Sequence, residues 1–155
     1  MRTLLLVTAL IFALPAVQTA AAAGMDSQPA AVARDPDYDS GKQAIEAKDW
    51  KLALERFSRA AARDPGNADI HNYLGYAHRQ SGNLDAAFRS YGEALRLDPG
   101  HRGAHEYIGE AYLIAGNLAK AEGHLAALDR LCFFSCEEYR DLKKTVEAFR
   151  QRAKP

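Results

Sequence analysis

The chain has 155 residues, of which 20 are basic and 20 are acidic, so its formal net charge at pH 7 is zero. This length suits a single domain. The balanced charge provides no basic surface of the kind that collects phosphate groups, which argues against a protein that binds nucleic acid.

Residues 1–23 have the composition of a secretory signal peptide. Arg2 gives a short positive start, residues 4–14 form an apolar core, and the alanines at 20–23 offer cleavage sites. The core is shorter than the ~20 residues of a membrane-spanning helix, and no cysteine follows it to carry a lipid anchor. We therefore expect an exported protein, periplasmic or secreted, with no stable membrane insertion after cleavage. An uncleaved N-terminal membrane anchor is the alternative.

The next segment, residues 24–35, is rich in alanine and has no apolar periodicity, so we expect a flexible leader. The first helix is expected to follow it, at residues 38–48. From about residue 36 the chain repeats with a period of 34 residues. The recurring positions are Gly41, Gly75 and Gly109, then Ala53, Ala87 and Ala121, then Phe57, Tyr91 and Leu125, and Pro65 with Pro99.

A polar residue precedes the second apolar stretch of each unit: Asp49, Asn83 and Asn117. Each side-chain oxygen can accept a hydrogen bond from a free backbone N–H at the start of a helix. Gly82 and Gly116 come one residue earlier, where the preceding helix must end with a residue of positive φ. The prolines that close the units are expected to end the second helix. Each unit is therefore predicted to be a helix, a tight turn and a helix.

The three repeated glycines lie inside the first helix of each unit. Glycine costs about 1 kcal/mol relative to alanine in a helix interior, so three equivalent glycines indicate a close approach of two helices. We expect each glycine to face the repeated alanine of the second helix. The larger residues Phe57, Tyr91 and Leu125 would then fill the next layer of the core.

With this period and these small, aromatic and proline positions, the chain resembles the tetratricopeptide repeat family. The resemblance implies an all-α domain at residues 36–155, a right-handed α-solenoid of three helix-turn-helix repeats at about 36–66, 68–100 and 102–131. It also implies that the first helices line a concave groove that binds a protein or peptide segment. The groove positions of the family correspond to Tyr38, Lys42, Asn72, Tyr76, Arg79, Glu106, Glu110 and Leu113 in this sequence.

These groove positions are chemically mixed. Family members that hold the carboxylate end of a partner place lysine and asparagine in the groove, as Lys42 and Asn72 do here. Glu106 and Glu110 depart from that pattern and make one end of the groove acidic. The sequence therefore predicts a peptide-binding groove without identifying the partner or the oligomeric state.

The last segment, residues 137–152, has one apolar face. Tyr139, Leu142, Val146 and Phe149 follow one another at helical spacing, with charged residues between them. We expect a capping helix that covers the open end of the third repeat, because a solenoid needs a polar outer face at its end.

Cys132 and Cys136 lie between the third repeat and this helix. Two cysteines in an exported protein usually form a disulfide, and an unbroken helix would give that bond poor geometry. We therefore expect the helix to end near Cys132. The alternative is an exported thiol or copper-binding carrier, since a pair of thiolates can hold Cu(I).

No residue pattern indicates catalysis or a bound cofactor. His71 and His105 recur at the repeat period and are interpreted as packing residues. His101 and His105 are four residues apart and could share a metal ion on a helix, but no third ligand is evident, so no metal site is predicted. The sequence has no catalytic motif, and its acidic residues are expected on solvated helix faces. The predicted function is a non-catalytic interaction scaffold or adaptor.

Overall fold

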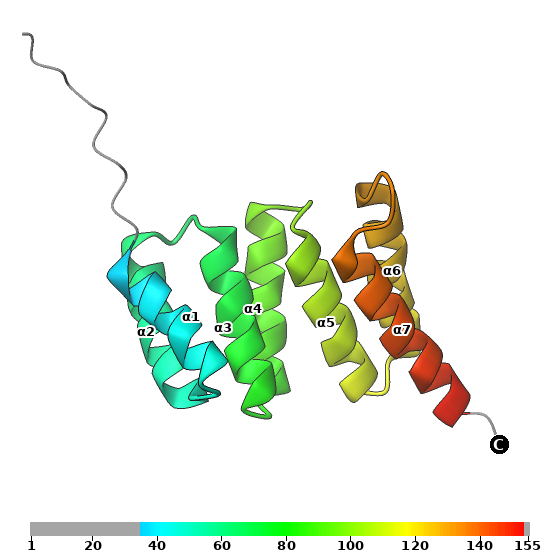
Figure 1. Cartoon of the computed structure of the whole chain (residues 1–155), viewed down its shortest axis with the longest axis horizontal. Coiled ribbons are helices and arrows are strands. Elements are labelled where there is room, and N and C mark those ends of the chain that lie inside the picture. Colours follow the sequence, from blue (N-terminus) through cyan, green and yellow to red (C-terminus); the bar gives the residue numbers. More distant parts are fainter. Residues whose placement is uncertain (1–34, 154–155) are drawn as a thin grey trace, which may run out of the picture. The chain divides into compact units, whose positions relative to one another are not determined.

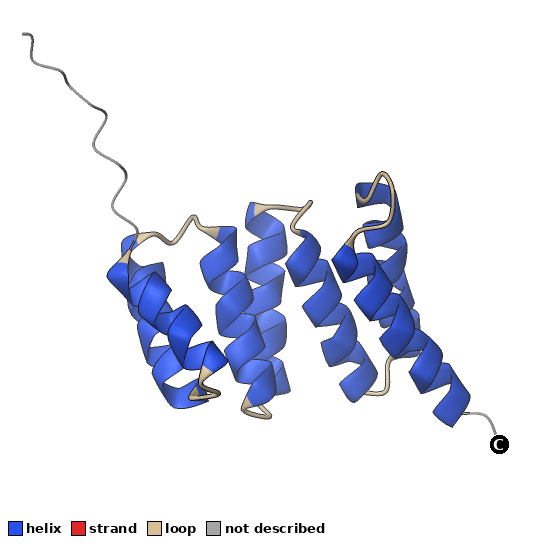
Figure 2. Ribbon diagram, viewed as in Figure 1, coloured by secondary structure: helices blue, strands red, loops and turns tan. Residues whose placement is uncertain are grey.

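A computed structural model describes residues 35–153, and within this range the chain consists of helices and turns (Figures 1 and 2). The predicted signal peptide and all but the last residue of the predicted leader lie outside the described residues. The helices are α1 Pro36–Glu46, α2 Trp50–Arg63, α3 Ala68–Gln80, α4 Leu84–Leu97, α5 Arg102–Ile114, α6 Leu118–Leu131 and α7 Glu137–Arg152. Over residues 35–153, no helix combines the length and apolar character needed to cross a membrane.

The helices form two layers. Each of α1, α3 and α5 pairs with the helix that follows it, and the pairs stand side by side in chain order (Figure 1). The first helices α1, α3 and α5 also contact one another in sequence, and α5 contacts α7, whereas α2, α4 and α6 make no contact with one another. Because the first helices and α7 contact one another in succession while the second helices do not, the first helices and α7 form the inner layer of a curved stack. The prediction of an all-α helical-repeat solenoid is confirmed.

The turn between the two helices of each pair is built as predicted. The side chains of Asp49, Asn83 and Asn117 accept hydrogen bonds from backbone N–H groups three residues later, at 3.0, 3.2 and 3.1 Å. The preceding residues Gly82 and Gly116 have φ angles of 79° and 75°.

The first pair has Lys48 at the position of these two glycines, and its φ is 57°. A side-chain-bearing residue in this left-handed conformation costs about 1 kcal/mol. The first turn therefore has the same geometry as the others at a higher conformational cost.

The first helix begins two residues before the predicted start at residue 38. The side chain of Asp35 accepts a hydrogen bond from the Asp37 N–H at 2.8 Å, and Pro36 occupies the first helical position, where it costs no hydrogen bond. Arg63 of α2 lies 2.6 Å from a carboxylate oxygen of both Asp35 and Asp37. Asp35 therefore belongs to the helical unit and not to the leader, whose predicted range included it.

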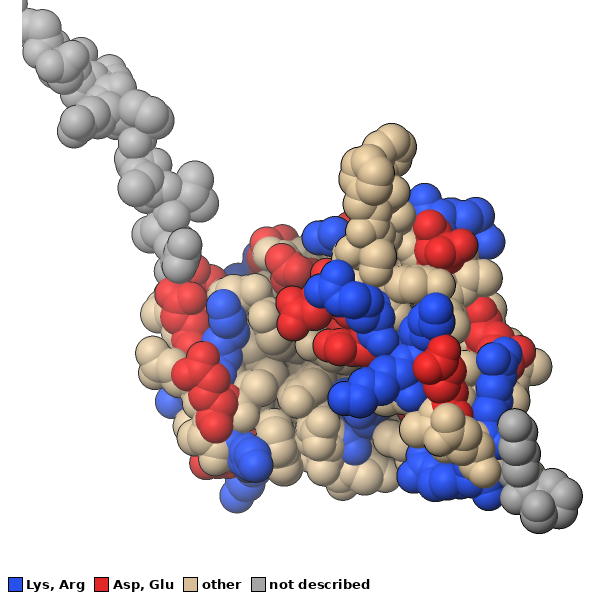
Figure 3. Space-filling view, turned by 45° about the vertical axis from the view of Figure 1, so that its right-hand side comes forward, with Lys and Arg blue, Asp and Glu red and all other residues tan. Residues whose placement is uncertain are grey.

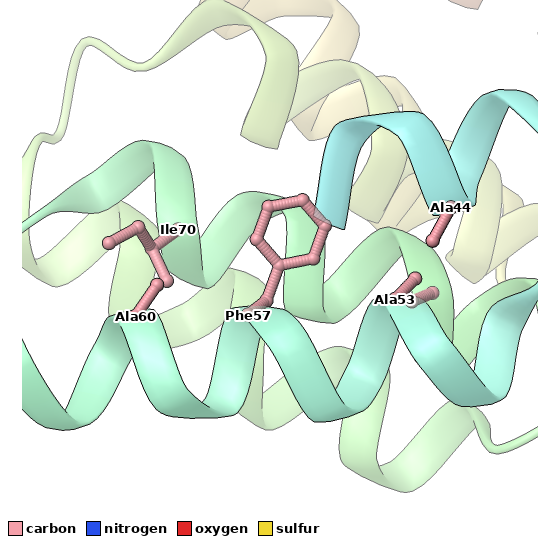
Figure 4. Close-up of a cluster of buried hydrophobic side chains, with 6 residues drawn as sticks. Ala44, Ala53, Phe57, Ala60 and Ile70 are labelled. Carbon is pink, nitrogen blue, oxygen red and sulfur yellow. The ribbon is translucent and has the colours of Figure 1, made fainter. Parts of the chain in front are cut away.

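The nearest neighbours of the repeated glycines Gly41 and Gly75 are aromatic rings and not the repeated alanines. A Cβ atom on Gly41 would lie 2.8 Å from the ring of Phe57, and one on Gly75 would lie 2.5 Å from the ring of Tyr91. The prediction that each glycine faces an alanine is wrong, because the longer ring reaches across the pair and fills the space that the missing Cβ leaves. Figure 4 shows Phe57 projecting from α2, with Ala60 beside Ile70 and Ala53 beside Ala44.

The third pair differs from the first two. A Cβ atom on Gly109 would lie 2.7 Å from Leu142 of α7, and not against Leu125 of α6. Leu142 and Val146 are fully buried, and the other two residues of the predicted apolar face pack against the same cluster. α7 spans the residues predicted for a capping helix and packs on both α5 and α6. The missing Cβ of Gly109 lets α7 approach α5 closely.

Candidate functional site

The inner helices α3, α5 and α7 enclose two hollows. The acidic hollow, of about 350 Å³, is lined by Asn72 and Tyr107 and by five acidic residues: Asp69, Glu106, Glu137, Glu138 and Asp141. The apolar hollow, of about 630 Å³, is lined by Leu113, Ile114, Thr145, Phe149 and Ala153 together with the charged residues Arg79, Glu110 and Arg152. Figure 3 shows acidic side chains gathered beside an uncharged, hollowed surface.

The two hollows adjoin each other along α5 and α7. Glu106 of the acidic hollow and Glu110 of the apolar hollow are one helical turn apart on α5, and Asp141 and Thr145 are one turn apart on α7. The two hollows therefore lie next to each other along the same two helices, and we call them together the α5–α7 groove.

Arg79 is fixed at the centre of this groove. Its guanidinium lies 2.9 Å from a Glu110 carboxylate oxygen and donates to the Tyr91 hydroxyl at 3.3 Å. It also lies over the rings of Tyr76 and Tyr107, 5.2 and 5.6 Å from their centroids. With a side chain only 10% exposed, Arg79 orders the groove floor and has little capacity left to bind a partner's carboxylate.

Glu106 has a different environment. It is half-buried and has no ion-pair or hydrogen-bond partner for its side chain within residues 35–153. Burial, together with the nearby carboxylates of Glu110, Asp141 and Glu138, raises the pKa of Glu106 to about 8. Burial also raises the pKa of Glu110, although Arg79 opposes this. The expectation that the acidic residues lie on solvated faces is therefore wrong for these two.

Asn72 lies in the wall of the acidic hollow with an unused acceptor. Its residue is 5% exposed, and its Oδ1 atom has no hydrogen-bond partner in the described part of the chain. A buried polar atom without a partner carries a desolvation cost of about 1–3 kcal/mol. The site therefore holds an acceptor that a ligand could satisfy.

Six of the eight predicted groove residues come together at the α5–α7 groove. Asn72 and Glu106 line the acidic hollow, and Arg79, Glu110 and Leu113 line the apolar hollow. Tyr76 packs on Tyr107 between them, with 5.1 Å between ring centroids.

The other two predicted residues, Tyr38 and Lys42, lie elsewhere on the inner layer. They line a separate hollow of about 400 Å³ beside α1 and the start of α3. Asp69 borders both this hollow and the acidic one. A role in binding stays a prediction for all eight residues.

Sequence reasoning missed the contribution of α7 to the groove. Glu138, Asp141, Thr145 and Phe149 face the two hollows, whereas the sequence analysis treated this helix only as a cover. The signal was present, because Glu138, Asp141 and Thr145 follow one another at helical spacing on a face next to the apolar stripe, to which Phe149 itself belongs.

His71, His101 and His105 have structural partners. The Nε2 atom of His71 lies 3.0 Å from the carbonyl oxygen of Pro65, and that of His105 lies 3.1 Å from the carbonyl oxygen of Pro99. His101 caps the start of α5 with one ring nitrogen and contacts a carboxylate of α3 with the other. His101 and His105 thus have different partners and do not converge on a shared site.

The two cysteines form a disulfide, with 5.5 Å between their Cα atoms. α6 ends at Leu131, as the predicted helix break near Cys132 requires. The chain has no free thiol for the alternative of a copper carrier. Phe133 and Phe134 inside the closed loop are 91% and 87% exposed, and this loop projects at the top of Figure 1.

The fold of this chain is similar to that of several solved structures. The type III secretion translocator chaperone SycD of Yersinia enterocolitica is 20% identical over 75% of this chain and 82% of that chain, with a TM-score of 0.68. The TPR2B domain of yeast Sti1, solved in a complex with pHsp70, is 18% identical over 75% of this chain and 94% of that chain, with a TM-score of 0.69. PcrH, solved with the chaperone binding region of PopD, is 21% identical over 76% and 91% of the two chains, with a TM-score of 0.67.

Identities this low show the fold alone, and no curated protein sequence matches the chain. The family follows from the sequence itself. Two models of the tetratricopeptide repeat match residues 38–101 and 78–144, which together span more than half of the chain. The matched region contains the repeated glycines, the capping residues and most of the α5–α7 groove. The chain therefore belongs to the tetratricopeptide repeat family.

Proposed function

We propose that this protein is a non-catalytic interaction scaffold that binds an extended segment of a partner protein in the α5–α7 groove. The observation that carries the proposal is the apolar hollow, which presents Leu113, Ile114 and Phe149 beside a fixed ion pair. A concave apolar site with a few ordered polar groups is the usual form of a binding pocket. Ile114 is 60% exposed, so one large apolar side chain of a partner could cover it.

The order of the groove supports binding without a large rearrangement. Arg79 is held by Glu110, Tyr91 and two aromatic rings, and α7 is packed on both helices of the third pair. A site whose walls are already ordered spends less binding free energy on ordering them. Similar structures solved with bound segments of partner proteins give the proposal further support.

Filling the apolar hollow should weaken binding strongly. Thr145 is half-buried in its wall, and its hydroxyl bonds only to the Leu142 carbonyl of its own helix. We expect Thr145→Trp to place an indole ring in the hollow and to weaken peptide binding about tenfold or more, as the loss of a central contact does. The measurement is selection of peptides from a random library displayed on phage, followed by fluorescence polarisation with the selected peptides.

The matched control is Gln151→Trp, which adds the same ring at an exposed position of α7 outside the hollow. Peptides selected on the unchanged protein should bind this variant normally. A library that yields no retained peptide, or peptides that bind the Thr145→Trp variant as tightly as the unchanged protein, would overturn the proposal.

We also propose that the protein is exported to the periplasm or secreted. The composition of residues 1–23 supports this, and so does the disulfide between Cys132 and Cys136, because such bonds persist in oxidising compartments. N-terminal sequencing of the mature protein should find a chain that begins at Ala23 or Gly24. A mature chain that still begins at Met1 would contradict the proposal.

A further inference from the structure

We infer that the segment bound in the α5–α7 groove is basic, and that a lysine or arginine side chain of the partner enters the acidic hollow. This inference rests on the proposed function and names the chemistry of the partner. Family members that hold the carboxylate end of a partner prefer a negative ligand, whereas this groove would prefer a positive one. Three features of the groove support this inference: the charges around the acidic hollow, an unused acceptor in its wall and the distance to the apolar hollow.

Negative charge around the acidic hollow is only partly balanced. Five acidic side chains line it. Arg102 lies 3.6 Å from Glu138, and His101 lies 3.0 Å from Asp69. In the described part of the chain, Glu106, Glu137 and Asp141 form no ion pair. A cation that enters the hollow would meet the carboxylates of Glu137 and Asp141 and would favour ionisation of Glu106, which is largely protonated at neutral pH, whereas a carboxylate ligand would be repelled.

The wall of the acidic hollow also favours a ligand that donates hydrogen bonds, independently of its charge. Asn72 is 95% buried, and its Oδ1 atom is an acceptor without a partner. Ammonium and guanidinium groups carry only donors, so either could satisfy Asn72 and the Glu106 carboxylate together. A bound carboxylate has only acceptors and could not satisfy the Asn72 Oδ1 atom.

Glu106 makes the binding of a cationic group in the acidic hollow energetically favourable. Its carboxyl group is half-buried near Glu110, Glu138 and Asp141, and Arg79, which opposes the rise in its pKa, is already paired with Glu110. Leaving a carboxylate in such a place without a partner is unfavourable. A cationic ligand removes that cost, so the interaction is strongest for the ligand with the right charge.

The two hollows also predict the spacing of the bound residues. Glu106 and Leu113 are seven residues apart on α5, which corresponds to about 10 Å along a helix. An extended peptide covers that distance in about three residues. The bound segment should therefore carry a lysine or arginine about three residues from a large apolar residue.

The test uses the phage-displayed random peptide library on the full chain. Peptides that bind the unchanged protein and lose binding to Thr145→Trp should carry lysine or arginine about three residues from an aromatic or aliphatic residue. The Glu106→Gln variant, which keeps the side-chain shape, should bind a selected basic peptide about tenfold more weakly at about pH 8, since a charge-assisted contact is lost. Glu147→Gln, at an exposed position of α7 that lines neither hollow, should bind it normally.

The outcomes separate this inference from the proposed function. Groove-dependent peptides that are neutral or acidic would overturn the inference and leave the scaffold function intact. The same holds if Glu106→Gln binds the basic peptide as tightly as the unchanged protein does. Loss of binding in Glu106→Gln counts only if its melting temperature is no lower than that of the unchanged protein. A failed selection, or binding that is insensitive to Thr145→Trp, would overturn both.

Discussion

Replacing Gly75 with alanine is expected to lower the free energy of unfolding by about 2–3 kcal/mol. The added Cβ atom would lie 2.5 Å from two ring carbons of Tyr91, which is fully buried. The ring has little freedom to move, because its hydroxyl accepts a hydrogen bond from Arg79 and its other face packs in the core. The strain therefore exceeds the ~1 kcal/mol that alanine gains over glycine in a helix.

Gly92 provides the matched control. It lies on the exposed side of α4, and a Cβ atom there would meet no other atom within 4 Å. Gly92→Ala is expected to raise the free energy of unfolding by about 0.5–1 kcal/mol, since it only removes the conformational cost of glycine. Urea denaturation followed by circular dichroism measures both variants. Equal effects of the two substitutions would mean that Gly75 is not needed for close packing.

The second large effect concerns Glu106 without a ligand. Its pKa lies at about 8 in the folded protein and at 4.5 in an ordinary exposed glutamate. Between these two values the folded state keeps a proton that the unfolded state has released, so the contribution of Glu106 to stability falls as pH rises. Solvent screens part of this effect because the group is only partly buried. We expect Glu106→Gln to raise the free energy of unfolding at about pH 8 by about 1–2 kcal/mol.

The dependence on pH shows whether the charge of Glu106, and not another effect of the substitution, causes the change in stability. The gain in the Glu106→Gln variant should be small near pH 4.5, where both states of the unchanged protein are largely protonated, and should grow toward pH 8. Thermal denaturation across this range measures the difference, with Glu147→Gln as the control. A gain that does not change with pH would show that charge is not its source. Functional sites commonly contain residues that lower the stability of the fold.

The repeat pattern predicted the parts of the fold that depend on nearby residues. Asn83 and Gly82 shape their turn through contacts within a few residues, so their roles could be read from the period of the sequence. The partner of Gly109 could not be read in this way. It is Leu142 of α7, a helix outside the repeat, and only packing in three dimensions brings the two together.

The groove residues show the same difference between what nearby sequence determines and what packing in three dimensions determines. The family positions led to Asn72, Arg79 and Glu106, which lie on first helices. Their environments were not predicted, because they depend on neighbours from other helices. Glu106 became a half-buried acid only because α7 brings Glu138 and Asp141 beside it. Arg79 is a groove position of the family, yet in the structure its Nε and Nη2 donors already contact Tyr91 and Glu110.

The contact between Gly109 and Leu142 also limits how this array could be lengthened. Because α7 already occupies the place beside α5, a unit appended after residue 131 would have to displace it and expose Leu142 and Val146 to water. Engineering a longer array would instead require insertion of a whole 34-residue unit before residue 102. Such an insertion would leave the terminal helix and its glycine contact in place.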